Sequence, residues 1–235
     1  MALTEKSIRN IFIYAFPKFI GYGLNLITLP ILTRILTPED FGVIILAWMF
    51  PTIAVSILTF GLAPAAHRYY FEYREDEQKL NALMFSSQAI LYLFLIVSTS
   101  VMFFIKDYIS ELTMGGNRYG FAVFVAFISA YLGQIINFYL LLYQNMERAV
   151  IHSSFTVAQA LVTTIVSLLL VWHFKMSYMG MIYGSLAGSA IVCPAIFIHF
   201  NKSLKIIFKA RILFENIKYG LQIIPKSFTS FINRF

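Results

Sequence analysis

The sequence predicts an all-α fold, a polytopic helical membrane protein. Of its 235 residues, 59% are hydrophobic and only 12% are charged, which is outside the usual range of soluble domains. A helix of about 20 apolar residues crosses the hydrocarbon of a bilayer, whereas barrel strands span about 10 residues and alternate in polarity. Five stretches of at least 26 residues lack Asp, Glu, Lys and Arg: 41–66, 80–105, 119–146, 149–174 and 176–201.

Six complete spans and the start of a seventh are expected along the chain. The first is the least regular, because Lys18 lies near its middle. Lys6 and Arg9 precede its apolar run as they would in a signal peptide, but no small-residue cleavage site follows, so we expect it to be retained. The expected spans are 10–33, 41–64, 81–105, 119–145, 150–173 and 177–200, and the seventh begins near 216.

The charges between the spans predict the orientation. Eleven cations lie in the N-terminal segment or in segments 65–80, 146–149 and 201–218, which are expected on one side of the membrane. Four cations lie on the other side. Because cytoplasmic loops are rich in Lys and Arg, we expect the N-terminus on the cytoplasmic side of the membrane. The net charge of +7 is therefore explained by loop cations that fix the orientation of the chain and attract anionic lipid headgroups. A nucleic-acid partner is not expected.

Residues 201–215 form a natural boundary. Lys202, Lys205 and Lys209 alternate with apolar residues at helical spacings, which suits a basic amphipathic helix on the cytoplasmic face. A solvated loop with topogenic charge suits the same residues. The expected organisation is a six-helix lobe over 1–200, this linker over 201–215, and the start of a second lobe over 216–235.

An internal repeat supports the second lobe. Pro17-Lys18 is followed by Asn25, and Pro225-Lys226 is followed by Asn233, each eight residues after the proline. Both copies start on the same side of the membrane, so the two halves would be parallel repeats. Such repeats build transporters with a site between two lobes.

The lysines of this repeat are the leading candidates for a site. An ionisable residue at mid-membrane depth usually faces a polar cavity or a partner, and Lys18, Lys226 and Arg234 all fall within spans. Pro17 and Pro225 remove a backbone hydrogen bond and would kink their helices, as a hinge requires. For Lys18 the alternative is that its long stem snorkels to the cytoplasmic interface.

Two motifs carry a resemblance to a known family. Residues 29–42 read Leu-Pro-Ile-Leu-Thr-Arg-Ile-Leu-Thr-Pro-Glu-Asp-Phe-Gly, and residues 60–70 read Phe-Gly-Leu-Ala-Pro-Ala-Ala-His-Arg-Tyr-Tyr. The pattern resembles the polysaccharide biosynthesis flippases, the O-antigen (Wzx-type) transporters of lipid-linked oligosaccharides. Their superfamily also contains multidrug and toxin extruders and lipid II flippases.

The resemblance implies two six-helix lobes around a central cavity with alternating access. It implies a lipid-linked oligosaccharide as substrate, such as an undecaprenyl-pyrophosphate-linked repeat unit, and other polysaccharide-assembly membrane proteins as partners. The cations that would bind the pyrophosphate are Lys18, Lys226, Arg234 and Arg34. Because relatives are about twice as long, we expect this chain to be an N-terminal portion.

Polar residues within the spans have two readings. Asn25, Gln134, Asn137 and Tyr139 would line the cavity and bind sugar hydroxyls, or they would hydrogen-bond to neighbouring helices. Gln134 and Asn137 share a face of their helix because they are three residues apart.

The segment between the first two spans also has two readings. Thr37 can cap a helix whose first turn holds Pro38, Glu39 and Asp40. Arg34, beside the outer mouth, would meet a phosphate or pair with Glu39 or Asp40.

No catalytic chemistry is visible in the sequence. It contains no metal-ligand spacing, no nucleophile with a base and no nucleotide-binding loop, so we expect a non-enzyme without cofactor or metal. A polysaccharide polymerase or ligase, the alternative from another class, would have a large outer loop, and the expected outer loops are short. A drug or cation extruder of the same superfamily usually has an acid within these spans, and none is present.

Overall fold

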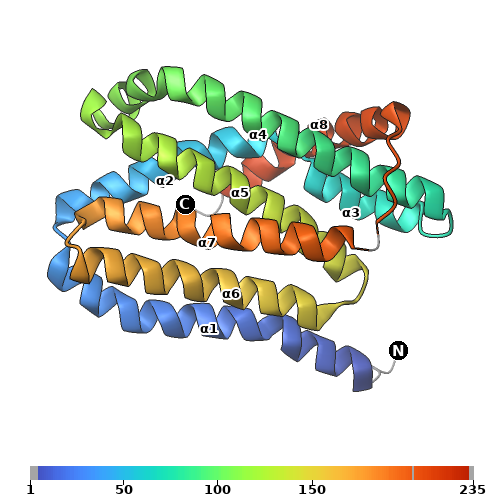
Figure 1. The fold of residues 1–235 in the computed structure, drawn as a ribbon, viewed down its shortest axis with the longest axis horizontal. Helices are drawn as coiled ribbons and strands as arrows, with labels where there is room; N and C mark the ends of the chain where they lie inside the picture. Colours follow the sequence, from blue (N-terminus) through green and yellow to red (C-terminus); the bar gives the residue numbers. More distant parts are fainter. Residues whose placement is uncertain (1–4, 203, 233–235) are drawn as a thin grey trace.

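The computed structural model describes residues 5–202 and 204–232, with the side chains of residues 9–202 and 204–222. Figure 1 shows long helices lying side by side and alternating in direction. The elements are α1 (Glu5–Ile35), α2 (Pro38–Leu58), α3 (Leu62–Glu72), α4 (Glu77–Met114), the short η1 (Asn117–Tyr119), α5 (Gly120–Asn145), α6 (Ala149–Leu168), the π-helical η2 (Leu169–His173), α7 (Ser177–Asn201) and α8 (Ala210–Ile232).

The predicted all-α membrane fold and its six spans are confirmed. Within the described residues, six segments are long and apolar enough to cross a membrane: Arg9–Ile35, Pro38–Glu72, Glu77–Met114, Asn117–Asn145, Ala149–His173 and Ser177–Asn201. The helix that contains the span predicted at 81–105 is longer than that span, because α4 has 38 residues and is roughly 57 Å long. Charged residues mark the edge of the membrane and not the end of the helix, so α4 extends beyond the bilayer.

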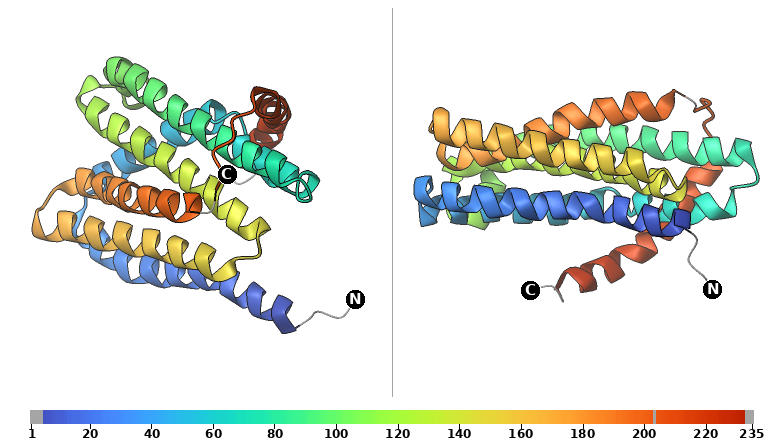
Figure 2. Two further views of the ribbon diagram at one scale, coloured as in Figure 1. Left: turned by 45° about the vertical axis from the view of Figure 1, so that its right-hand side comes forward. Right: turned by 90° about the horizontal axis from the view of Figure 1, so that it is seen from below.

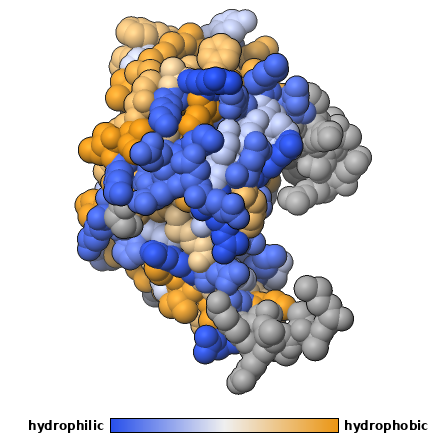
Figure 3. All heavy atoms as spheres, turned by 90° about the vertical axis from the view of Figure 1, so that its right-hand side faces the viewer, coloured by the Kyte–Doolittle hydropathy of each residue, from blue (hydrophilic) through white to orange (hydrophobic). Residues whose placement is uncertain are grey.

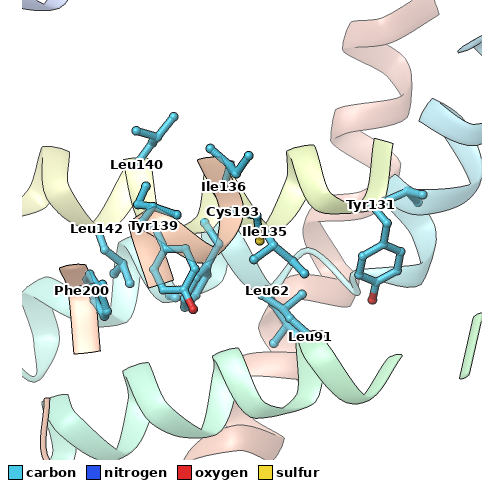
Figure 4. Packing of buried hydrophobic residues seen from close by; sticks show 14 of the residues in the cluster. Leu62, Leu91, Tyr131, Ile135, Ile136, Tyr139, Leu140, Leu142, Cys193 and Phe200 are labelled. Atoms are coloured by element: carbon cyan, nitrogen blue, oxygen red, sulfur yellow. The ribbon is translucent and has the colours of Figure 1, made fainter. Parts of the chain in front are cut away.

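The helix α5 is the centre of the bundle. It packs against α2, α3, α4 and α7. Tyr131, Ile135, Tyr139 and Tyr143 recur every four residues along it and are at most 1% exposed. Figure 4 shows Tyr131, Ile135 and Tyr139 near Leu62 of α3 and Leu91 of α4. The bulk of the apolar packing therefore lies around this helix.

A line of glycines brings α7 close to α6. Gly180, Gly184 and Gly188 recur every four residues, and a Cβ atom at Gly184 would collide with Ser167 of α6. A Cβ atom at Gly188 would collide with Thr163 in the same way. Small residues at this spacing let membrane helices approach closely.

The second predicted span, 41–64, lies within Pro38–Glu72 but is not one continuous helix. The helix α2 ends at Leu58, and Phe60 and Gly61 have φ angles of +50° and +60°, a left-handed conformation that ends helices. The chain becomes helical again as α3, so most of the predicted loop 65–80 is helix.

The linker prediction also needs correction. Residues 204–209 have no regular secondary structure, and α8 begins at Ala210 instead of 216. The amphipathic-helix reading is therefore wrong for 204–209, which form a loop, and the topogenic role of the charges there stays a prediction. The physical reason lies in the backbone: the N–H of Lys205 donates to Asn81 Oδ1 at 3.2 Å and that of Lys209 to Ser86 Oγ at 3.1 Å.

The first half of α8 is docked on α3 and on the start of α4. Asn216 is fully buried and donates to Ser87 Oγ at 2.7 Å. One turn later, Gly220 crosses the left-handed turn so closely that a Cβ atom at Gly61 would lie 2.6 Å from the Gly220 carbonyl oxygen. The right-hand view of Figure 2 shows α8 crossing beneath the bundle from this point.

Side chains at the edge add to this docking. Tyr73 donates to Glu215 Oε2 at 3.1 Å, and burial, together with this hydrogen bond, raises the pKa of Tyr73 to about 12. Lys205 Nζ lies 2.8 Å from Glu77 Oε1. Both groups of this ion pair are exposed, so it contributes about 0–1 kcal/mol.

The charged segments gather at one end of the bundle, which we call the basic end. It is formed by the start of α1 and by residues 73–76, 146–148 and 204–209 (Figure 1). Figure 3 looks onto this end and shows hydrophilic side chains across it. The loops that the charge count assigns to one side of the membrane therefore lie at one end of the bundle. Their cytoplasmic location stays a prediction.

Replacing Gly220 with leucine should release α8 from the lobe, because a side chain at this position collides with Phe60 and Gly61. Hydrogen exchange in detergent should show amides 210–220 exchanging at least tenfold faster. The control Leu221→Ala, at an exposed neighbouring position, should not change exchange. Unchanged exchange in Gly220→Leu would contradict the docking.

Candidate functional site

The start of α2 is a rigid structural element. The Thr37 hydroxyl accepts from the Asp40 N–H, and the Thr37 N–H donates to Asp40 Oδ2 at 2.9 Å, which makes a capping box. Pro38 follows in the first turn, so the predicted helix start is confirmed. Across the turn, Glu39 Oε1 accepts from Arg118 Nη2 at 2.8 Å, and Asp40 accepts from Ser177.

These contacts decide one reading of Arg34. Because Glu39 and Asp40 are bound elsewhere, the predicted pairing of Arg34 with either of them is wrong. Arg34 lies exposed in the last turn of α1, and no ion pair joins it to an acid among the described residues. Its guanidinium is available to an anion, and a phosphate contact stays a prediction.

Lys18 is exposed on α1, whereas its neighbour Pro17 is buried. The helix continues without a break through Pro17 and Pro30, so the hinge role of Pro17 stays a prediction. Asn25 lies seven residues, about two turns, further along, and therefore shares the face of α1 that carries Lys18. Within the described part of the chain, no ion pair involves Lys18.

Two adjoining hollows open on this side of the lobe. The first has a volume of about 390 Å³ and lies between α2, α5, α6 and α7; its lining is Trp48, Thr52, Ala126, Ser129, Ala130, Gly133, Gln159, Ser185 and Ser189. The second, of about 370 Å³, lies between α1 and α6; its lining is Gly21, Leu24, Asn25, Thr156, Gln159, Ala160, Thr163 and Thr164. Gln159 lines both, and we call the two hollows together the Gln159 groove.

The groove carries polar side chains among apolar ones and is uncharged. None of the residues that line it is Asp, Glu, Lys or Arg. Gln159, Ser129 and Ser185 lie near the middles of the spans Ala149–His173, Asn117–Asn145 and Ser177–Asn201. Since the hydrocarbon is about 30 Å thick and a helix rises 1.5 Å per residue, these groups lie near mid-membrane depth.

Of the predicted cavity residues whose side chains the structure describes, only Asn25 lines the groove. Gln134 is half-buried and Asn137 is exposed; neither lines either hollow. Tyr139 is fully buried and donates to Gln88 Oε1 at 3.0 Å, so its interhelical reading is the one that holds. Gln88 also donates to Asn201 Oδ1 at 2.8 Å, which ties α4 to α5 and α7.

Part of the predicted site lies outside what the structure describes. Arg234 is beyond the described residues, and so are the side chains of Pro225 and Lys226. Among the described residues, no group of three or more His, Cys, Asp or Glu side chains is placed to hold a metal ion.

Gln159 and the serines around it escaped the sequence analysis. Serine and threonine are common in membrane helices, so single hydroxyls carry little information. A usable signal was the Gly180, Gly184 and Gly188 series with Ser185 and Ser189 one residue further on. This pattern places the hydroxyls beside a close helix contact.

Replacing Tyr139 with phenylalanine tests whether this residue is structural. Loss of its hydrogen bond to Gln88 should lower the free energy of unfolding in micelles by about 1 kcal/mol and leave activity unchanged. The control Tyr108→Phe, at an exposed position, should leave stability unchanged. Lost activity at unchanged stability would instead place Tyr139 in the site.

Comparison with known proteins places the chain in a family. Residues 7–235 match the family model described as "Polysaccharide biosynthesis protein". A search of curated proteins finds no match. A solved structure, the outward-facing conformation of a multidrug resistance MATE family transporter of the MOP superfamily, superposes with a TM-score of 0.71 at 15% identity, covering 90% of this chain and 51% of that chain. This likeness shows the fold, and the chain spans about half the length of that transporter.

The family model matches almost the whole length of the chain. This match shows that the chain belongs to the polysaccharide biosynthesis protein family.

Proposed function

We propose that this lobe is part of a flippase that moves a lipid-linked oligosaccharide across the bacterial inner membrane by alternating access. The substrate class is a polyprenyl-pyrophosphate-linked repeat unit, as in O-antigen and lipopolysaccharide synthesis. Membership of the polysaccharide biosynthesis family and a fold shared with half of a transporter support the proposal.

The observation that carries the proposal is the Gln159 groove. Hydrocarbon offers no hydrogen bonds, so exposing a polar hollow to lipid at mid-membrane depth costs free energy. Most of its hydroxyls are bonded within the protein, but Gln159 Oε1 accepts no hydrogen bond from the described residues, so water, a second lobe or a polar cargo would supply the partner that lipid cannot. Six spans with a hollowed polar side are the form expected of one wall of a transport path.

The exposed cation beside this path is suited to an anion. Lys18 shares a face of α1 with Asn25, which lines the groove, and its ammonium group is not ion-paired within the described residues. A pyrophosphate is a dense anion that lysine binds as a point charge. Lys18, Arg34 and, in the second lobe, Lys226 and Arg234 are the proposed phosphate-binding cations.

Two other activities fit the structure less well. A polymerase or ligase needs catalytic groups, and the outer junctions of the described chain are only 36–37, 115–119 and 174–176. A cation extruder needs an acid that faces the path, and no carboxylate lines the groove.

Replacing Lys18 with alanine tests the proposal in cells whose surface polysaccharide depends on this protein. Surface polysaccharide should fall at least tenfold, and the lipid-linked precursor should accumulate. Lys18→Arg should retain activity because it keeps the charge. Lys202→Ala, at an exposed lysine just after α7, is the matched control and should act as wild type.

Protein level and membrane insertion are measured in each strain. Normal polysaccharide with correctly inserted Lys18→Ala protein would rule out the role of Lys18. Drug sensitivity that changes in a deletion strain while polysaccharide stays normal would favour the extruder instead.

A further inference from the structure

We propose that the Gln159 groove is a saccharide subsite, which binds the uncharged sugar units of the cargo apart from its phosphates. This proposal rests on the proposed function and assigns the phosphates and the sugars of the cargo to different sites. Lys18 and the groove would contact different chemical parts of one substrate.

The lining chemistry suits sugars. Ser and Thr hydroxyls and the Gln and Asn amides each both donate and accept hydrogen bonds, as sugar hydroxyls do. A phosphate needs cations and a cationic drug needs an acid, and the groove contains neither. Each hollow also falls within the range of about 300–1,000 Å³ typical of ligand clefts.

Some of these groups are held in place while others stay available. Ser129 Oγ and Ser185 Oγ are 2.7 Å apart, and Gln159 Nε2 donates to Ser189 Oγ at 3.4 Å. The Thr52 hydroxyl donates to the Trp48 carbonyl at 2.7 Å. Gln159 Oε1, however, accepts no hydrogen bond from the described residues, and it lies where both hollows meet. An acceptor in that position suits a sugar hydroxyl.

Trp48 adds an aromatic wall. Its side chain lines the first hollow and is half-buried, so part of the indole faces the groove. An aromatic ring offers an apolar surface to the C–H face of a sugar ring while the hydroxyls at the ring's edge bond to polar neighbours. The indole N–H is buried and has no partner among the described residues.

The spacing along α1 separates the two parts of the cargo. Seven residues separate Lys18 from Asn25, which is roughly 10 Å along the helix axis. Lys18 lies on the side of the basic end and Asn25 lines the second hollow. A pyrophosphate at Lys18 would therefore place the attached saccharide along α1 towards Gln159.

Tryptophan fluorescence tests this arrangement directly. Residues 1–235 contain two tryptophans, and Trp172 is 70% exposed outside the groove, so Trp172→Phe leaves Trp48 as the one tryptophan of this lobe. This protein, in lipid nanodiscs, is titrated with undecaprenyl pyrophosphate and with the saccharide-bearing carrier extracted from a strain that lacks the transporter. We expect a saturable change with the saccharide-bearing carrier only. Equal responses to both carriers, or a response to neither, would overturn the subsite.

A variant pair gives a second, independent readout. In the same background, Gln159→Leu should weaken the fluorescence response to the glycosylated carrier at least tenfold, and the matched control Gln144→Leu, exposed near the basic end of α5, should not. Gln159→Asn, which keeps the amide, should retain part of the affinity if leucine prevents folding. Unchanged affinity in both Gln159 variants would overturn the subsite.

The failures of the two proposals are distinguishable. If Lys18→Ala abolishes surface polysaccharide and both Gln159 variants bind as wild type, the subsite is wrong and the flippase stands. If Lys18→Ala makes normal polysaccharide and neither carrier changes the fluorescence, both proposals are wrong.

Discussion

Hydrocarbon offers no hydrogen-bond partners, and this one constraint organises the whole lobe. In its interior the constraint is met by pairing: Tyr139 donates to Gln88, Gln88 bonds to Asn201, and Asn216 bonds to Ser87. These bonds join helices far apart in the chain. The same constraint makes the Gln159 groove informative, because Gln159 Oε1 accepts no hydrogen bond from the described residues and lies in an open hollow where lipid could not supply one.

Close packing and the groove have a common origin in α7. Gly180, Gly184 and Gly188 turn one face of this helix to α6, so the adjacent Ser185 and Ser189 are directed to the edge of that contact. The small residues of α5 then leave space in front of them. The hollow therefore results as much from the glycines and other small residues as from the polar side chains at its edge.

The fold was largely readable from the sequence, because charge-free runs of this length allow few structures. Helix ends were less predictable: charges at Lys79 and Lys106 mark the membrane edge, and α4 continues past both. The break at Phe60 and Gly61 lies in close contact with Gly220, about 160 residues away, and no local pattern reveals that neighbour. The linker was mistaken for a possible helix because its backbone bonds are made to α4 side chains.

The site was predicted less well than the fold, for a physical reason. A lone lysine in an apolar run is conspicuous, so Lys18 was found, and Asn25 was found with it through the repeat. Gln134 and Asn137 were equally conspicuous, but whether a side chain lines a cavity depends on the rotation of its helix. Gln159 acquires its position only when α1, α2, α5, α6 and α7 are assembled around it.

The docking of α8 has a consequence for how the protein is made. Membrane helices are delivered in order as the chain leaves the ribosome, and domains generally fold as units from the N-terminal side. Asn216 and Gly220 fasten the chain onto α3 and α4, so the lobe and the first turns of α8 can close as one unit once residue 220 has emerged. The residues made after Gly220 then extend from a helix that is already docked on the folded lobe. The direction of α8 is therefore set before those residues are made.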